Sequence, residues 1–71
     1  NHFNELIFNG LRMVEGISTE KLTELFSGDI DKYFNTKVDK WDGLELSNDK
    51  LFLNETGIML ADEIASDLFI D

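Results

Sequence analysis

The chain has 71 residues, no cysteine and a formal net charge of −9, because 15 acidic residues face six lysines and arginines. A chain of this length forms one domain, and it buries only roughly 60 % of its unfolded surface, near the lower limit for folding alone. Without cysteine it has no disulfide and no thiolate metal site, which fits a reducing, cytoplasmic environment. The negative charge repels phosphate backbones and anionic membranes, so we expect neither nucleic acid nor membrane as a partner.

No apolar run approaches the ~18 residues of a membrane span, and no signal-peptide pattern opens the sequence. The hydrophobic fraction of 42 % is that of a packed globule. Because the chain begins without Met, we expect an excised domain, a fragment or a processed product, with residues 1–71 forming a single domain.

Apolar residues at three- and four-residue spacing predict a first helix over Phe3–Val14. A second helix is predicted over Ser18–Ser27, with Ser18 as its N-cap and Gly28 as its stop. The members of the first stripe are Phe3, Leu6, Ile7, Leu11 and Val14.

A third helix is predicted to begin at Asp29 or Asp31, either of which can cap it, and to end before Gly43. Its apolar face includes Trp41, which we therefore expect to lie toward the core. Lys37 falls within the apolar half and should extend to solvent or pair with an acid.

Two short strands, Leu44–Ser47 and Lys50–Leu53, flank Asn48–Asp49, whose residue types tolerate the positive φ of a hairpin turn. A last helix is predicted over Asn54–Ile70, with Asn54 as its N-cap. Its wide apolar stripe consists of Ile58, Leu60, Ala61, Ile64, Ala65, Leu68 and Phe69. Three helices, a two-stranded hairpin wing and a C-terminal helix indicate an α+β, mostly helical, winged-helix-like fold.

Few residues offer chemistry. His2 is the only histidine and stands near a chain end, where we expect it to be exposed to solvent and without a role. Asp62, Glu63 and Asp67 are hard metal ligands by type, but they fall on one face of the last helix, which is the pattern of a solvated surface. The sequence has no nucleophile–base pair and no Gly-rich phosphate loop. We therefore expect no catalytic, cofactor-binding or metal-binding residue in this chain.

The winged-helix pattern raises DNA binding, with the third helix in the major groove and the wing on the backbone. The outward face of that helix offers only two lysines against Asp39, and the passage from Asp29 to Asn54 has no arginine for guanine contacts. Protein docking is the better reading. Its candidate residues are Arg12, Trp41 and Phe52. Strand alternation sends Phe52 away from the core. Arg12 lies off its helix stripe, where we expect it to pair with an acid such as Glu15 or Glu5.

An ordered set of short motifs resembles one known family. Gly10-Leu11-Arg12 precedes Glu15-Gly16-Ile17-Ser18, then come Phe26-Ser27-Gly28 and Leu53-Asn54-Glu55-Thr56-Gly57. This order resembles the C-terminal domain of oxygen-independent coproporphyrinogen III oxidase-like proteins, which are radical S-adenosylmethionine proteins. Two departures are Asn54, where the family usually has Thr, and Ser27, which separates Phe26 from Gly28.

The resemblance implies an upstream barrel-like catalytic domain in the same chain, which holds a [4Fe–4S] cluster on a cysteine motif and binds S-adenosylmethionine. It implies a place in porphyrin biosynthesis or in a branch that resembles heme chaperones. The present chain would then be a non-catalytic accessory domain that packs against the catalytic domain. No cluster ligand carries over, because the chain has no cysteine.

Two other functions remain open at this point. The chain could be a free-standing winged-helix module that binds protein or, less well supported, DNA. It could also bind heme itself, with His2, Met13 and Met59 as its few potential axial ligands.

Overall fold

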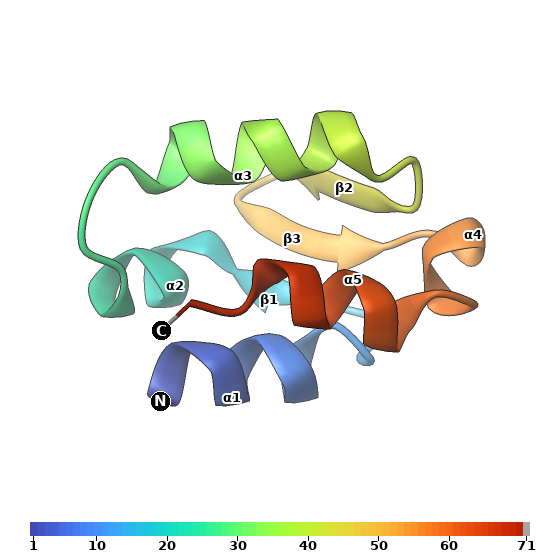
Figure 1. Cartoon of the computed structure of the whole chain (residues 1–71), viewed down its shortest axis with the longest axis horizontal. Helices are drawn as coiled ribbons and strands as arrows, with labels where there is room; N and C mark the ends of the chain where they lie inside the picture. The colour runs from blue at the N-terminus through green and yellow to red at the C-terminus, as the bar shows by residue number, and fades with distance from the viewer. Residues whose placement is uncertain (71) are drawn as a thin grey trace.

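The computed structural model describes residues 1–70. It has the helix–strand–helix–helix–hairpin order of a winged helix, followed by two C-terminal helices, so the predicted α+β, mostly helical class is confirmed. In Figure 1, α3 runs along one side of the molecule and α1 along the other, with the sheet and α5 between them. The elements are α1 (His2–Gly10), β1 (Ile17–Ser18), α2 (Thr19–Leu25), α3 (Ile30–Lys40), β2 (Leu44–Ser47), β3 (Lys50–Leu53), α4 (Glu55–Ile58) and α5 (Ala61–Leu68).

The sheet is antiparallel, with the strand order β1-β3-β2. The predicted hairpin is confirmed: Asn48 and Asp49 both have positive φ, 53° and 60°, as a primed turn requires. The sequence did not predict β1, which pairs Ile17 with Leu51, because two residues are too few for an alternating pattern. Ser18 precedes α2 as predicted, but its side chain makes no capping hydrogen bond.

One apolar core joins the sheet to all the longer helices. Phe3 from α1 lies at its centre, with ring centroids 5.6 Å from Phe26 and 6.3 Å from Phe34. The core therefore connects the two ends of the chain to α3. Its buried members are Phe3, Ile7, Leu11, Ile17, Leu22, Ile30, Phe34, Leu44, Leu51, Leu53, Ile64, Ala65 and Leu68.

The first helix is shorter than predicted. It ends at Gly10 instead of Val14, and Val14, which was assigned to the buried stripe, is 98 % exposed. Gly10 is buried against Ile17, where a Cβ atom would overlap the Ile17 side chain. Gly16 adopts a φ of +74°, which reverses the chain into β1. The two glycines thus favour a loop over a fourth helical turn.

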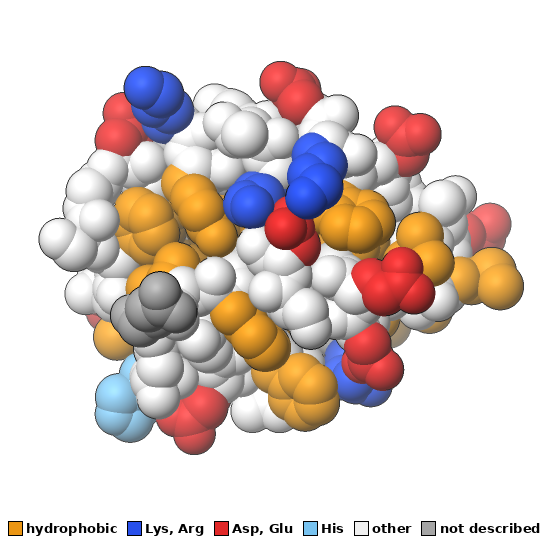
Figure 2. Space-filling view, viewed as in Figure 1, with side chains coloured by type: hydrophobic (Ala, Val, Ile, Leu, Met, Phe, Trp, Pro, Cys, Tyr) orange, Lys and Arg blue, Asp and Glu red, His pale blue; other side chains and the backbone are white. Residues whose placement is uncertain are grey.

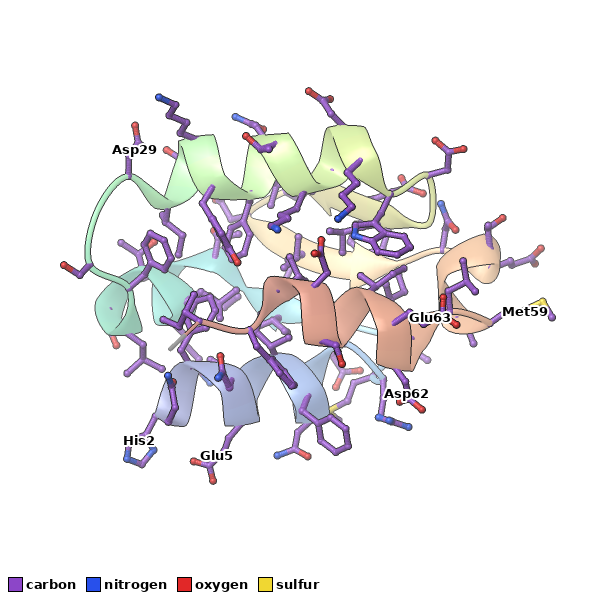
Figure 3. The ribbon with its side chains drawn as sticks, in the orientation of Figure 1. His2, Glu5, Asp29, Met59, Asp62 and Glu63 are labelled. Atoms are coloured by element: carbon purple, nitrogen blue, oxygen red, sulfur yellow. The ribbon has the colours of Figure 1, made fainter. Side chains whose placement is uncertain are left out.

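The second and third helices differ from prediction mainly at their junction. Helix α2 ends at Leu25, so Gly28, with a φ of +120°, belongs to the connecting turn and does not cap the helix directly. Asp29 caps α3 as predicted, since its side chain accepts a hydrogen bond from the Lys32 amide at 3.1 Å (Figure 3).

The predicted continuous last helix is wrong. Asn54 does cap its start, but the chain leaves helical geometry after Ile58 and resumes at Ala61, and α5 ends at Leu68. The apolar pattern placed Ile58 and Leu60 in a buried stripe, whereas Ile58 is 63 % exposed and Leu60 lies at the turn. Near the break, Gly57 approaches Gly43 so closely that no Cβ atom would fit between them, which holds α4 against the turn between α3 and β2.

Candidate functional site

Helix α5 is held on one side by a cluster around Asp67. Its carboxylate accepts hydrogen bonds from the Trp41 indole N–H at 2.9 Å, the Lys37 ammonium at 3.2 Å and the Lys40 ammonium at 3.1 Å. Figure 2 shows this cluster as blue side chains that border a red one between α3 and α5. Lys37 therefore pairs with an acid, as predicted, but Asp67 does not lie on a freely solvated face as expected.

The cluster changes the acidity of its members. The Trp41 hydrogen bond, with smaller contributions from Lys40 and Lys37, lowers the pKa of Asp67 from 3.8 to about 2. Burial raises the pKa of Tyr33, and the negative charge of Asp67 raises it further. The Tyr33 hydroxyl donates to the Leu68 carbonyl at 3.0 Å, a second bond from α3 to the end of α5. The cluster is thus a permanently charged bond between the two helices at neutral pH.

Two of the predicted docking residues are partly covered. Trp41 is half-buried and packs on the core, as its place on the helix stripe predicted, and its indole N–H is already bonded to Asp67. Phe52 does point away from Leu51 and Leu53, but it is half-buried because the loop at Gly16 approaches it. Neither side chain is as open as a docking residue on a free surface would be.

Arg12 lies in the loop after α1 and contacts α5. Its guanidinium forms an ion pair with Asp62 and lies over the Phe8 ring, 4.6 Å from the ring centroid. The predicted pairing with an acid is therefore confirmed, but the acid is Asp62 and not Glu15 or Glu5, the two examples expected from the sequence. The sequence offered no sign of this contact, because Arg12 and Asp62 are 50 residues apart. Figure 3 shows Asp62 directed from α5 toward the segment that follows α1.

Exposed apolar side chains lie on both sides of Arg12. Met13 and Val14 follow it in the loop and are 54 % and 98 % exposed. Beside the Arg12–Asp62 pair, Ile58 ends α4, and Met59 and Leu60 form the turn to α5. Met59 is 86 % exposed and projects from the end of the molecule (Figure 3). Arg12 and the residues of this turn also line a hollow of about 210 Å³. We call the set Arg12, Met13, Val14, Ile58, Met59 and Leu60 the docking surface.

The remaining candidates do not converge on a ligand. His2 is exposed on α1, with its Nδ1 atom 3.7 Å from the Glu5 carboxylate, and it lies at the opposite end of the molecule from Met59 (Figure 3). These two potential heme ligands cannot bind one iron within a single copy. Over residues 1–70 there is no group of three His, Cys, Asp or Glu residues that could hold a metal ion. An iron–sulfur cluster does not fit this chain either, because the sequence lacks cysteine.

The part of the chain that the structure describes also has no helix long and apolar enough to cross a membrane.

Fold and site together define a small winged-helix-like module. The family model described as the HemN C-terminal domain matches residues 1–60, which is most of the chain. The chain belongs to this family, and the resemblance seen in its motifs is confirmed. Comparisons with curated proteins and with solved structures gave no match.

Proposed function

We propose that this chain is the non-catalytic C-terminal accessory domain of an oxygen-independent coproporphyrinogen III oxidase-like radical S-adenosylmethionine protein, and that it packs against the upstream catalytic domain of the same polypeptide. The observation that carries the proposal is the match to the HemN C-terminal domain over residues 1–60. A domain described by its C-terminal position has other chain before it, and that chain is the natural partner.

The docking surface supports this packing. A small monomer rarely exposes several large apolar side chains together unless something covers them. Here Val14, Ile58 and Met59 are the three most exposed large apolar residues of the described chain, and all three belong to the docking surface. Two of them stand on connecting segments, which can change shape without disturbing the core.

The chemistry of the parent protein belongs to the upstream part in this proposal. That part would hold the [4Fe–4S] cluster and S-adenosylmethionine, while residues 1–71 form one domain that helps to cover the substrate side. The absence of cysteine from this chain and the proposed cytoplasmic location agree with each other. Both the porphyrin oxidase branch and the heme-chaperone branch fit this arrangement, since in either case the upstream domain would bind the porphyrin or heme.

A free-standing winged-helix module is the alternative, and its DNA-binding version is the weaker form. Lys37 and Lys40 on α3 both bond the single carboxylate of Asp67, so two of the three lysines on the helix that would enter the groove are already held in an ion pair within the domain. The net charge of −9 opposes phosphate contact further. Retention on a DNA column that falls with added salt would favour this alternative.

The first test is the size of the native protein. An antibody raised against this domain should detect a band several times larger than 8.1 kDa in cell extract. The purified species should contain iron and bind S-adenosylmethionine. A band near 8.1 kDa would contradict the proposal and leave the free-standing module.

The docking surface is tested in the same intact protein. Met59→Asp should loosen the contact between the domains and speed protease cleavage of the segment before Asn1, because it places a charge in an apolar interface. Asn35→Asp, on the exposed face of α3, is the matched control and should leave the cleavage rate unchanged. Equal rates for both variants would show that the upstream domain does not cover Met59.

A further inference from the structure

Half of the positively charged side chains in this chain have no ion-pair partner within the described residues, and two of these lie close together. Of the six lysines and arginines, Arg12 pairs with Asp62, while Lys37 and Lys40 pair with Asp67. Lys21, Lys32 and Lys50 remain. Within residues 1–70, none of these three ammonium groups takes part in an ion pair or a hydrogen bond. Two of them, Lys21 and Lys50, line the same pocket.

This pocket lies where α1, the loop after it, β1, α2 and β3 meet, and it has a volume of about 320 Å³. The pairing of Ser18 with Lys50 brings the start of β3 beside the start of α2, and Lys21 is in the first turn of that helix. Leu6 and Ile17 line the pocket with apolar side chains, and Met13 lines it from the loop after α1. The local chain path therefore places two exposed lysines at the edge of one partly apolar hollow.

The charge of the pocket is opposite to that of the rest of the molecule. Glu15 is its one acidic lining residue, and no ion pair joins Glu15 to either lysine within the described chain. Two unneutralised ammonium groups on a domain with a net charge of −9 would attract a carboxylate. The volume is at the lower end of the range for small-molecule sites, and it suits one or two side chains.

We infer that this pocket receives an acidic side chain, with an apolar residue beside it, from the upstream domain of the same polypeptide. The inference rests on the proposed function and names the contact that function would use. Charge complementarity favours a carboxylate as the bound group. The loop that contains Met13 and Val14 indicates the upstream domain as its source, because this loop contributes both to the pocket and to the docking surface. Met13 of the pocket follows Arg12 and precedes Val14 in the docking surface, so a domain that covers Val14 also reaches the pocket.

Zero-length crosslinking tests this contact in the intact parent protein. A carbodiimide joins an amine to a carboxylate only where the two groups touch, and peptide mass spectrometry then identifies the joined residues. We expect Lys21 or Lys50 to be joined to an aspartate or glutamate upstream of Asn1, at least tenfold more often than Lys32 is. Lys32 is the matched control because it is an exposed lysine without an ion pair, located outside the pocket.

Three results would overturn the inference. Lys21 and Lys50 could be joined only to acids within residues 1–71, they could be joined no more often than Lys32, or a mixture of ¹⁵N-labelled and unlabelled protein could show that the acid comes from a second copy. Any of these results in a protein whose size and iron content match the proposal would reject the pocket contact alone. A parent without an upstream domain would reject the proposed function instead.

Charge reversal provides an independent readout. The double variant Lys21→Glu/Lys50→Glu places like charges against the incoming carboxylate, and protease cleavage before Asn1 should become about tenfold faster. Lys32→Glu should leave the rate unchanged. Both variants change exposed side chains, so a circular dichroism spectrum equal to that of the wild type identifies the effect as one of docking.

Discussion

The Trp41 indole N–H donates to the Asp67 carboxylate across 2.9 Å, and this bond joins the end of α3 to the last turn of α5. Lys37 and Lys40 complete the contact from the same helix face, since they stand four and one residues before Trp41. The four side chains fix the C-terminal helix against α3, beside the buried core residues of α5, Ile64, Ala65 and Leu68. Loss of the Asp67 charge should therefore lower the free energy of unfolding.

Asp67→Asn should lower the free energy of unfolding by about 2 kcal/mol. The amide keeps one acceptor for Trp41 but leaves Lys37, whose side chain is only 19 % exposed, without a counter-charge. Urea denaturation followed by far-UV circular dichroism measures the change without relying on Trp41 emission. Asp39→Asn, an exposed position on α3, is the control and should stay within about 0.5 kcal/mol of the wild type. Equal destabilisation of both variants would mean that the cluster contributes nothing of its own.

The same carboxylate predicts a dependence of stability on pH. The pKa of Asp67 is about 2 in the folded chain, against an ordinary value of 3.8, so the folded state favours the charged form. Its contribution, on the order of 2 kcal/mol, is complete above the unfolded pKa and is lost as the pH falls through the folded pKa. Between about pH 5 and pH 2, the wild type should lose stability more steeply than Asp67→Asn does. Parallel curves from acid titrations of the two proteins would refute this assignment.

The sequence predicted the elements whose pattern is local. The Asn48–Asp49 turn, the Asp29 cap and the buried face of α5 depend on residues near one another in the chain, and all three were confirmed. The end of α1 and the break between α4 and α5 depend on contacts with distant segments. In both places a glycine allows close approach that a helical pattern does not reveal.

In the candidate site too, features that depend on local patterns were predicted, and features that depend on contacts between distant segments were not. The motifs predicted the family, and Lys37 was expected to find an acid. The pairing of Arg12 with Asp62 spans 50 residues, and Ile58, which apolar spacing placed in the buried stripe, is exposed where the helix breaks. The docking roles of Arg12, Trp41 and Phe52 stay predictions, with Arg12 the one that lies within the docking surface.

Gly57→Ala should be among the most damaging single changes in this chain. A Cβ atom at Gly57 would overlap the carbonyl group of Gly43, and backbone cannot move aside as a flexible side chain can. We expect a loss of about 3 kcal/mol or more, which is a large part of the stability of so small a domain. Thr56→Ala changes the exposed neighbour and should cost less than about 1 kcal/mol. Thermal unfolding of the two variants compares them directly, and similar melting temperatures would show that α4 can shift away from Gly43.

Asn54 joins more of the structure than a helix cap requires. Its Oδ1 atom accepts from the Gly57 amide at 3.0 Å, while its Nδ2 atom donates to the Asp42 carbonyl at 3.0 Å and to the Glu45 carboxylate at 2.8 Å. Thr, the usual residue of the family at this position, can cap the helix but cannot make the two Nδ2 bonds. The amide thus connects the start of α4 both to the turn that precedes β2 and to β2 itself.

Asn54→Thr should therefore cost about 1 kcal/mol, and Asn54→Ala, which removes the cap as well, about 2 kcal/mol. Chemical denaturation gives both values, and Glu55→Gln, an exposed first-turn change that leaves these bonds intact, is the control. If Asn54→Thr unfolds at the same denaturant concentration as the wild type, the Nδ2 bonds add no stability. The cap alone would then account for Asn54, and the departure from the family's threonine would be neutral.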